Sequence, residues 1–313
     1  MALTDPAHDG SGGFAVANAP CSFGAFELTV GTTQVPDPEL LLDAVAGAGY
    51  AGIDLGPVGY LGSNGILRAR LAERGLGLAG GYVGLPFSNP EQFSDSLTML
   101  DAVLDAFDGT APGPAPPRPT LADAGSAERA AHPGRAALDR SVGLGRAKWR
   151  TFAHNLAVAV ERCRERGYEP TFHPHTATYV EAEWEIERLL ESSDVGVCLD
   201  TGHLLLGRAD PVAAVRQWGE RINQVHLKDA RREVLERIVA DAAPVVEIWR
   251  RRAFCALGEG DVDVPGVLDA LAEIGYRGWL VVEQDILPEP GAPVERAASE
   301  QRRNREYLRA RGI

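Results

Sequence analysis

Histidines, carboxylates and one lysine follow four apolar segments in the second half of the chain, and residues of these types could bind a metal ion. The apolar segments are residues 168–172, 195–199, 222–225 and 279–282, and the polar residues are His173, His175, Asp200, His203, His226, Lys228 and Glu283. Side chains at the C-terminal ends of parallel barrel strands converge on one site. Imidazoles and carboxylates that converge in this way indicate a divalent metal, and a mixed set suits Mn²⁺, Co²⁺ or Zn²⁺ better than Ca²⁺ or Mg²⁺.

Each of these residues also has an ordinary structural explanation. An aspartate at a strand end, such as Asp200, often caps the following helix. His226 alone would more often be a hydrogen-bonded core residue, and Glu283 alone could be an ion-pair partner. Lys228 could pair with Asp229 at the surface, where such a pair has little energetic weight. Ligand-type residues at the ends of four successive strands, however, favour one shared site.

The two histidines after the first apolar segment share one face of the predicted strand with Thr171, because side chains alternate across a strand. Either His173 or His175 is expected to bind the metal, while the other orients the substrate or carries a proton. For His203, a substrate contact and structural support both stay open. Three carboxylates near the ends of earlier strands are weaker candidates: Asp54 and Glu27, for which surface or capping roles are favoured, and Asp123, which ranks above them.

Strand and helix patterns alternate along the whole chain. Apolar runs predict strands at residues 14–18, 51–55, 77–84, 118–123, 168–173, 195–199, 222–227 and 279–283. Helices are predicted at residues 38–48, 66–74, 90–107, 146–166, 182–190, 211–220, 264–274 and 294–311. This alternation favours parallel βαβ units and an α/β fold, a single (β/α)₈ TIM barrel over residues 1–313. A weak internal repeat, residues 48–53 against 274–279, supports one repeating architecture.

Three segments interrupt the alternation. Residues 1–13 are polar and glycine-rich, and we expect a frayed tail there rather than a signal peptide. Residues 124–145 follow the fourth strand on the catalytic face, where a lid over the active site and a mobile surface loop are equally favoured. Residues 231–252 have an Arg- and Glu-rich helical pattern that could cap the site or serve a subunit contact.

Charge and composition exclude some classes of partner. A net charge of −13 argues against a nucleic-acid partner, because phosphate binding relies on a basic surface. Hydrophobic residues make up 45% of the chain and charged residues 24%, as expected for a globular protein, and no apolar run is long enough to cross a bilayer. We therefore expect no membrane partner and a cytoplasmic location.

A divalent metal in such a site can bind the oxygens of a ketone and its neighbouring hydroxyl, which polarises the carbonyl and makes the adjacent C–H acidic. Removal of that proton by a base gives an enediolate. Returning the proton to another carbon or face is isomerisation or epimerisation, whereas expelling a β-hydroxyl is dehydration. The metal site alone does not decide between these outcomes.

Five motifs occur in order along the second half of the chain. They are His173-Pro-His175 with residues 178–181, the strand ending in Asp200-Thr-Gly-His203, and residues 221–229, 258–263 and 275–285. Together they resemble the xylose isomerase-like TIM barrel family and, within it, the inosose dehydratases. The resemblance implies a metal-dependent lyase that dehydrates a cyclic polyol ketone such as 2-keto-myo-inositol. A sugar or inosose isomerase or epimerase acting on a ketose is the alternative, and a non-catalytic binding barrel is a further one.

The resemblance also implies a ligand set. Isomerases and epimerases of the family bind one divalent metal, often Mn²⁺ or Co²⁺, through Glu, Asp, His and Glu from strands five to eight. Asp200, His226 and Glu283 fill the last three of these places. The candidates for the first place are Thr171, His173 and His175, and His175 is taken as the ligand.

Four residues form the predicted catalytic set. Glu283 is expected to act as general base as well as ligand, and Lys228 to polarise or protonate a substrate oxygen. His173 and His203 complete the set. Barrels of this type often pair, which leaves a homodimer open.

Overall fold

The computed structural model describes residues 13–27, 29–31, 35–63, 65–111, 113–288 and 294–313. Apart from Gly13, the predicted N-terminal tail lies outside the described residues. Within the described ranges, no helix has both the length and the apolar composition that crossing a membrane requires.

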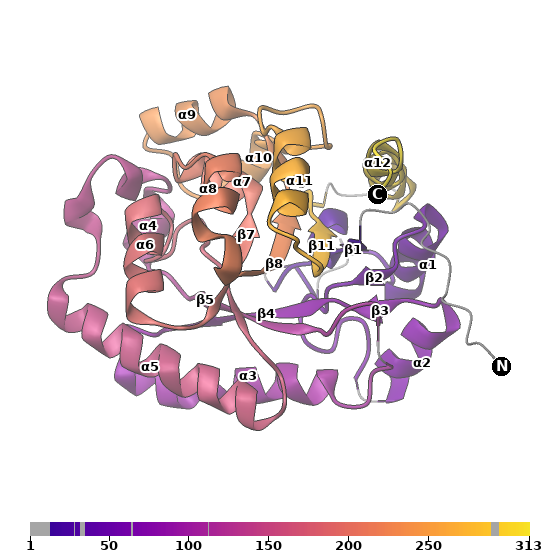
Figure 1. Ribbon diagram of the computed structural model, residues 1–313, viewed down its shortest axis with the longest axis horizontal. Coiled ribbons are helices and arrows are strands. Elements are labelled where there is room, and N and C mark those ends of the chain that lie inside the picture. The colour runs from indigo at the N-terminus through magenta and orange to yellow at the C-terminus, as the bar shows by residue number, and fades with distance from the viewer. Residues whose placement is uncertain (1–12, 28, 32–34, 64, 112, 289–293) are drawn as a thin grey trace.

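A parallel sheet of nine strands forms the centre of the molecule (Figure 1), in the order β3-β2-β1-β11-β8-β7-β6-β5-β4. The strands are β1 (Ala15–Asn18), β2 (Gly52–Ile53), β3 (Gly77–Leu78), β4 (Gly80–Leu85), β5 (Arg118–Asp123), β6 (Thr171–Phe172), β7 (Gly196–Asp200), β8 (Ile222–Leu227) and β11 (Trp279–Val282). Only Ala79 separates β3 from β4, the two strands at the ends of this order. The sheet therefore forms a nearly closed barrel with eight strand positions, and the predicted TIM barrel is confirmed.

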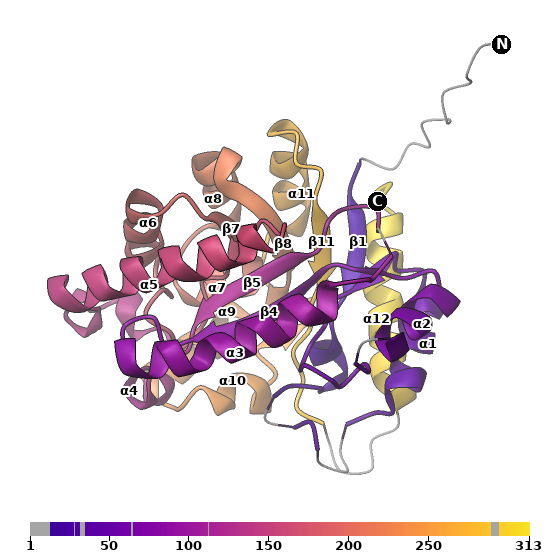
Figure 2. The same ribbon diagram turned by 90° about the horizontal axis from the view of Figure 1, so that it is seen from below.

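Helices surround the strands on the outside of the barrel (Figure 1). The longer ones are α1 (Pro38–Ala48), α2 (Gly65–Glu73), α3 (Pro90–Phe107), α5 (Arg146–Glu165), α6 (Glu183–Ser192), α8 (Pro211–Trp218), α11 (Val264–Glu273) and α12 (Val294–Arg309). Figure 2 shows α3 and α5 running side by side across one face of the sheet. Each predicted helix is found, with ends that differ by a few residues at most.

Four of these helices begin in the same way, with an acidic or amide side chain just before a proline in the first turn. The capping side chain accepts hydrogen bonds from backbone N–H groups of that turn, and the caps are Asp37 of α1, Asn89 of α3, Asp210 of α8 and Asp263 of α11. Such a cap stabilises a helix by about 1 kcal/mol. Proline is tolerated in the first turn because the backbone N–H that it lacks would have no partner within the helix. The helices are thus fixed where the sequence predicts them.

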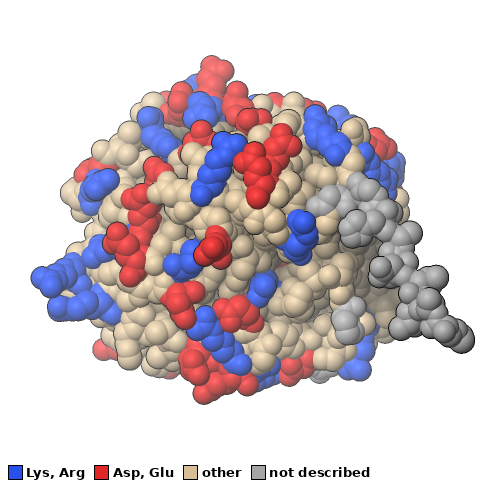
Figure 3. All heavy atoms as spheres, in the orientation of Figure 1, with Lys and Arg blue, Asp and Glu red and all other residues tan. Residues whose placement is uncertain are grey.

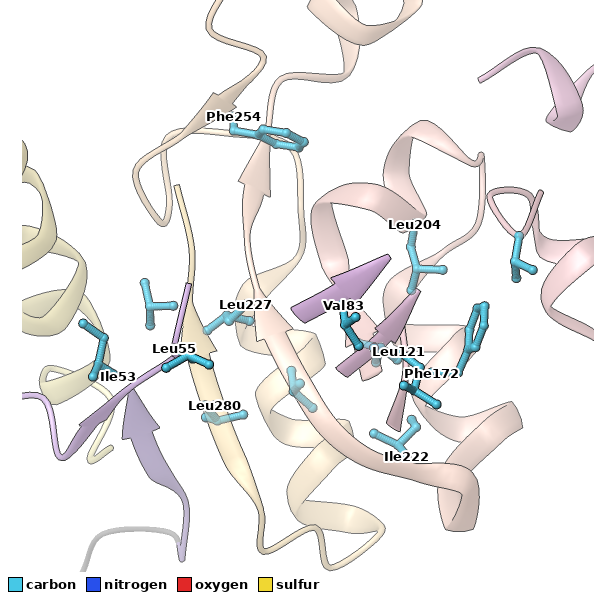
Figure 4. Packing of buried hydrophobic residues seen from close by; sticks show 14 of the residues in the cluster. Ile53, Leu55, Val83, Leu121, Phe172, Leu204, Ile222, Leu227, Phe254 and Leu280 are labelled. Atoms are coloured by element: carbon cyan, nitrogen blue, oxygen red, sulfur yellow. The ribbon is translucent and has the colours of Figure 1, made fainter. Parts of the chain in front are cut away.

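The core lies between the strands and the surrounding helices. Figure 4 shows buried side chains from successive strands packing together, among them Ile53, Val83, Leu121, Phe172, Ile222, Leu227 and Leu280. Burial of this apolar surface is the main force that holds the strands in place. The strand ends, and the polar groups on them, are therefore rigidly positioned.

Two insertions extend the barrel. Residues 231–252 contain α9 (Arg232–Ala240) and α10 (Val246–Arg250), as the helical pattern predicted, and antiparallel strands β9 (Asp229–Ala230) and β10 (Phe254–Cys255) flank them. Residues 124–145 contain the short helix α4 (Ala127–Ala131), and its buried Arg129 pairs with Glu185 at 2.9 Å and Glu181 at 3.4 Å. That this segment closes over the site stays a prediction.

Candidate active site

The three carboxylate and histidine ligands predicted from the later strands lie on adjacent strands. Asp200 ends β7 and stands in register with His226 of β8. His226 stands in register with Val281 of β11, two residues before Glu283. Because the strands are parallel, all three side chains reach the C-terminal end of the barrel, where sites of this fold are built.

Lys228 lies at the centre of this end of the barrel and is only 1% exposed. Its Nζ lies 3.1 Å from Asp200 Oδ2, 2.9 Å from Glu283 Oε2 and 3.0 Å from Asp285 Oδ2. His203 Nε2 lies 3.2 Å from the same nitrogen. One ammonium group thus meets three buried carboxylates, and a further cation would balance the remaining negative charge.

Two histidines link the carboxylates to one another. His226 Nδ1 lies 3.3 Å from Glu283 Oε1 and 3.1 Å from His173 Nε2. His173 Nε2 in turn lies 3.6 Å from Asp200 Oδ2. The predicted ligands Asp200, His226 and Glu283 are therefore brought together, with His173 among them.

The other two histidines stand beside this group. The His175 Nδ1–H donates to the carbonyl of Thr176 at 2.9 Å, which leaves Nε2 as the acceptor of the neutral ring. His203 Nδ1 lies 2.6 Å from Thr176 Oγ1. The two rings lie next to each other, with centroids 4.0 Å apart and planes tilted by 47°. Thr176 thus orients both rings.

Asp200 has both the structural and the site role that the sequence left open. Its Oδ1 caps α7 (Thr201–Leu206) by accepting from the N–H groups of Gly202 and His203, both at 2.9 Å. Its Oδ2 is buried without a hydrogen-bond partner and faces Lys228. The helix cap therefore fixes the carboxylate with one oxygen directed into the site.

The residues after Asp200 explain the position of Lys228. Thr201 Oγ1 donates to the Lys228 carbonyl at 2.6 Å and accepts from its N–H at 2.9 Å. At Gly202, a Cβ atom would lie 2.9 Å from the Cγ and Cδ of Lys228 and 3.0 Å from the Phe254 ring. Glycine is needed at this position because the lysine stem passes over it.

Charge and burial perturb the ionisable groups of the site. Burial lowers the pKa of His175 to about 3, so the ring is neutral near pH 7. Burial opposes the charge of Lys228, but its carboxylate neighbours raise the pKa well above the usual range. Burial likewise opposes ionisation of Glu283 and Asp200, yet the facing lysine and histidines lower both pKa values. Burial raises the pKa of Asp54 to about 7.

A pocket of about 210 Å³ opens onto this arrangement, and we call it the catalytic pocket. The predicted site residues that line it are His173, His175, His226, Lys228 and Glu283. Asp200 and His203 are buried next to these residues and do not line the pocket. The predicted site residues thus form one cluster, part of it lining the pocket and part of it behind the wall.

Further residues of the catalytic pocket were missed or underrated in the sequence. The surface or capping role favoured for Asp54 is wrong, because it is 4% exposed and its Oδ2 lies 3.7 Å from His226 Nε2. Tyr82 lies in the pocket wall with its ring 5.8 Å from that of His175. Exposed Glu27 lines the rim, whereas Asp123 lies outside the pocket and accepts backbone N–H bonds. The position of Asp54 directly after β2 could have indicated it, whereas Tyr82 lies within β4 and has no such signal.

The donor groups fit a divalent cation. Among the described residues, three buried carboxylate oxygens lack a hydrogen-bond partner, namely Oδ1 of Asp54, Oδ1 of Asp285 and Oδ2 of Asp200, which faces the Lys228 ammonium at 3.1 Å. Donor atoms of His173, Asp200 and His203 lie within 4.8 Å of one another, as do those of Asp54, His226 and Glu283. Imidazole with carboxylate is a donor set for Mn²⁺, Co²⁺ or Zn²⁺. The sequence left open which of Thr171, His173 and His175 is the first metal ligand. This geometry favours His173 over His175.

The sequence of residues 120–310 matches the model of a protein family described as xylose isomerase-like TIM barrel. The chain belongs to this family. An inosose dehydratase of Geobacillus kaustophilus is 29% identical over 257 residues, which cover 81% of this chain and 82% of that protein. The rhizopine catabolism protein MocC of Rhizobium meliloti is 36% identical over 149 residues, 47% of this chain and 46% of its own length. This second alignment thus spans about half of the relative.

Solved structures of the same fold extend over nearly the whole chain. L-ribulose 3-epimerase superposes with a TM-score of 0.65 at 18% identity, covering 95% of this chain and 96% of its own. The probable 3-DHS dehydratase AsbF of Bacillus anthracis superposes with a TM-score of 0.67 at 13% identity, covering 94% and 98%. At these identities the similarity shows the shared barrel fold and no more.

Proposed function

We propose that the protein is a metal-dependent lyase that removes water from a cyclic polyol ketone of the 2-keto-myo-inositol class. Relatives named inosose dehydratase support this substrate class, and one of them aligns over most of both chains. The catalytic pocket is small, about 210 Å³, which suits a single-ring substrate. Its wall carries the groups that proton transfer requires.

The observation that carries the proposal is the pairing of Lys228 with Glu283. The two side chains line the same pocket, with Nζ 2.9 Å from Oε2. Elimination of water requires a base that takes a proton from carbon and an acid that gives one to the departing hydroxyl. A carboxylate and an ammonium group side by side meet both requirements at once.

The metal in this proposal is held by Asp200, His226 and Glu283, with His173 as the fourth ligand. When bound, Mn²⁺ or Co²⁺ supplies a Lewis acid for the ketone and hydroxyl oxygens of the substrate. The Asp200 carboxylate is fixed by its helix cap through Oδ1, so its Oδ2, which faces Lys228, is the oxygen directed into the site. His226 is held between Glu283 and His173, which fixes the plane of its ring.

The residues of the chain then move the protons. The Glu283 carboxylate removes the proton from the carbon next to the ketone, and the C–H electrons form the enediolate. Lys228 donates a proton to the β-hydroxyl, the C–O bond breaks and water leaves. The resulting enol tautomerises to a diketone. Neutral His175, with Nε2 directed away from its bond to Thr176, can hold a substrate hydroxyl in the pocket wall.

The test is proton NMR of the Mn²⁺-loaded protein with 2-keto-myo-inositol in D₂O. The proposal predicts loss of water to a diketone, with deuterium from the solvent in the product. Deuterium exchange or a new ketose without loss of water would assign the protein to the isomerases or epimerases instead. No reaction, with metal shown to be bound, would reject the substrate class.

A further inference from the structure

His226 presents its two ring nitrogens to different groups. Nδ1 lies 3.3 Å from Glu283 Oε1 and 3.1 Å from His173 Nε2, which belong to two of the proposed metal ligands. Nε2 lies 3.7 Å from Asp54 Oδ2 instead. When a metal is bound at Nδ1, the hydrogen of the neutral ring is on Nε2. The group that faces Nε2 therefore influences which nitrogen is available to the metal.

Asp54 is a buried carboxylate at the edge of the barrel interior. It follows β2 directly, between Ile53 and Leu55, which Figure 4 shows among the core residues. Because side chains alternate along an extended segment, Asp54 points to the other side of the chain, where it lines the catalytic pocket. On the face drawn in Figure 3, acidic side chains lie at the surface among basic ones, whereas Asp54 is buried. Its position is not that of an ordinary surface carboxylate.

A glycine in the neighbouring strand leaves the space that Asp54 needs. A Cβ atom at Gly80, the first residue of β4, would lie 2.7 Å from Asp54 Oδ1 and 2.8 Å from Gln224 Nε2. Gln224 lies two residues before His226 on β8, and its Nε2 is 3.4 Å from His226 Nε2. Within the described part of the chain, Asp54 Oδ1 and Gln224 Oε1 are buried without a hydrogen-bond partner. Two polar side chains thus lie beside Nε2 of His226.

The burial of Asp54 is unfavourable for folding. A buried carboxyl group is destabilising unless it is paired and hydrogen-bonded. Among the described residues, the ion pair of Asp54 is with His226 alone. A buried polar group that lacks hydrogen-bond partners calls for a functional explanation. The group that explains the position of Asp54 is therefore the ring of His226.

We propose that Asp54 is a positioning residue of the metal site, whose carboxylate keeps the hydrogen of His226 on Nε2 and so leaves the lone pair of Nδ1 for the metal. Histidines that bind metals commonly direct their other ring N–H at a carboxylate, which fixes the tautomer and the ring orientation. A separation of 3.7 Å is that of a charge contact rather than of a hydrogen bond. In a buried site, such a contact still favours the tautomer with hydrogen on the side of the carboxylate. The role rests on the proposed function only in that His226 is a metal ligand, and it does not depend on the identity of the substrate.

Metal affinity is the first test, measured by calorimetry with Mn²⁺ in the absence of substrate. Asp54→Asn keeps an acceptor oxygen and removes the charge, whereas Asp54→Ala removes both. We expect Asp54→Ala to bind Mn²⁺ about 10–100-fold more weakly than the wild type, Asp54→Asn to lie between them, and the circular dichroism spectra to be unchanged. Wild-type affinity in Asp54→Ala would overturn the positioning role.

The matched control is Asp123→Asn, because Asp123 is also a buried aspartate at a strand end. It accepts hydrogen bonds from the backbone N–H groups of Gly125 and Tyr179 and lies outside the catalytic pocket. We expect its affinity for Mn²⁺ to equal that of the wild type. A loss of affinity in Asp123→Asn as large as in Asp54→Asn would show a general effect of removing a buried carboxylate and would overturn the role of Asp54.

The ring nitrogen that binds the metal is the second test, identified by proton–nitrogen correlation NMR of the histidine side chains in the Zn²⁺-loaded protein. His226→Gln assigns the signal of His226. The positioning role predicts metal on Nδ1 and hydrogen on Nε2 in the wild type, and faster exchange of this hydrogen with water in Asp54→Ala. Metal on Nε2, the nitrogen that faces Asp54, would make Asp54 a ligand instead and overturn the positioning role. Neither test depends on turnover, so a failure of 2-keto-myo-inositol to react would count against the proposed function alone.

Discussion

Replacing Lys228 with methionine removes the one ammonium group that faces three buried carboxylates. Lys228 is 1% exposed and lies within 3.1 Å of an oxygen of Asp200, Glu283 and Asp285. Methionine has a similar length and no charge, so the change leaves the apolar packing of the stem nearly intact. The three carboxylates then lose their shared ammonium partner, while His226 stays 3.3 Å from Glu283 Oε1.

The expected cost follows from this burial. Removing one partner of a buried ion pair costs about 3–5 kcal/mol, because the remaining charge has neither water nor a counter-ion. For Glu283, whose folded pKa is lowered, the stabilising effect is present above the unfolded pKa and is lost as pH falls through the folded pKa. The difference between wild type and Lys228→Met is therefore largest near pH 8 and shrinks below about pH 4.

The assay is urea unfolding of the metal-free protein at pH 8 and at about pH 3, below the unfolded pKa of a glutamate. Lys148→Met is the matched control, since Lys148 is the other lysine of the chain and is exposed on α5; a surface change of this kind alters stability by about 0.5 kcal/mol or less. Saturating Mn²⁺ is expected to narrow the gap for Lys228→Met, because a divalent cation balances the same carboxylates. A loss at pH 8 no larger than that of Lys148→Met would refute the reasoning.

Three further changes test other parts of the structure. Gly202→Ala places a methyl group against the stem of Lys228, so we expect turnover to fall at least tenfold with circular dichroism unchanged; full activity would contradict this. Arg129→Met leaves the buried carboxylates of Glu181 and Glu185 without their arginine and should lower the free energy of unfolding by about 3–5 kcal/mol. The control Arg135→Met removes an exposed arginine and should change this free energy little. Burial raises the folded pKa of Asp54 to about 7, so the wild type loses free energy of unfolding as pH rises from about 4 to about 7. Asp54→Asn should therefore gain stability relative to wild type between pH 5 and pH 8. A stability difference between the two proteins that does not change with pH would contradict this.

The barrel could be predicted from the sequence because its signals are local. Apolar runs mark the strands, and an acidic or amide cap followed by proline marks the start of four helices, including α3 at Pro90. Side-chain convergence followed from the parallel arrangement, which placed Asp200, His226 and Glu283 at one end. The antiparallel pair β9 and β10 was not predicted, because strands of two residues carry too little pattern.

Much of the site detail could not be predicted, because it depends on contacts between distant segments. Asp54 follows a strand of two residues, and nothing near it in the sequence separates a capping aspartate from a buried one beside His226. Asp285 becomes a partner of Lys228 only through the bend of the chain after β11. The sequence left the fourth ligand open between residues on one strand face, and only the positions of the rings favour His173.

The central claim is that Glu283 and Lys228 act as base and acid in the loss of water. The most direct measurement is proton NMR of 2-keto-myo-inositol in D₂O with Mn²⁺-loaded wild type and Lys228→Met, at a temperature where both are folded. Loss of the general acid predicts that the variant still exchanges the C–H proton for deuterium but forms diketone about 10²–10⁴-fold more slowly. Diketone formation at the wild-type rate in Lys228→Met would contradict the account.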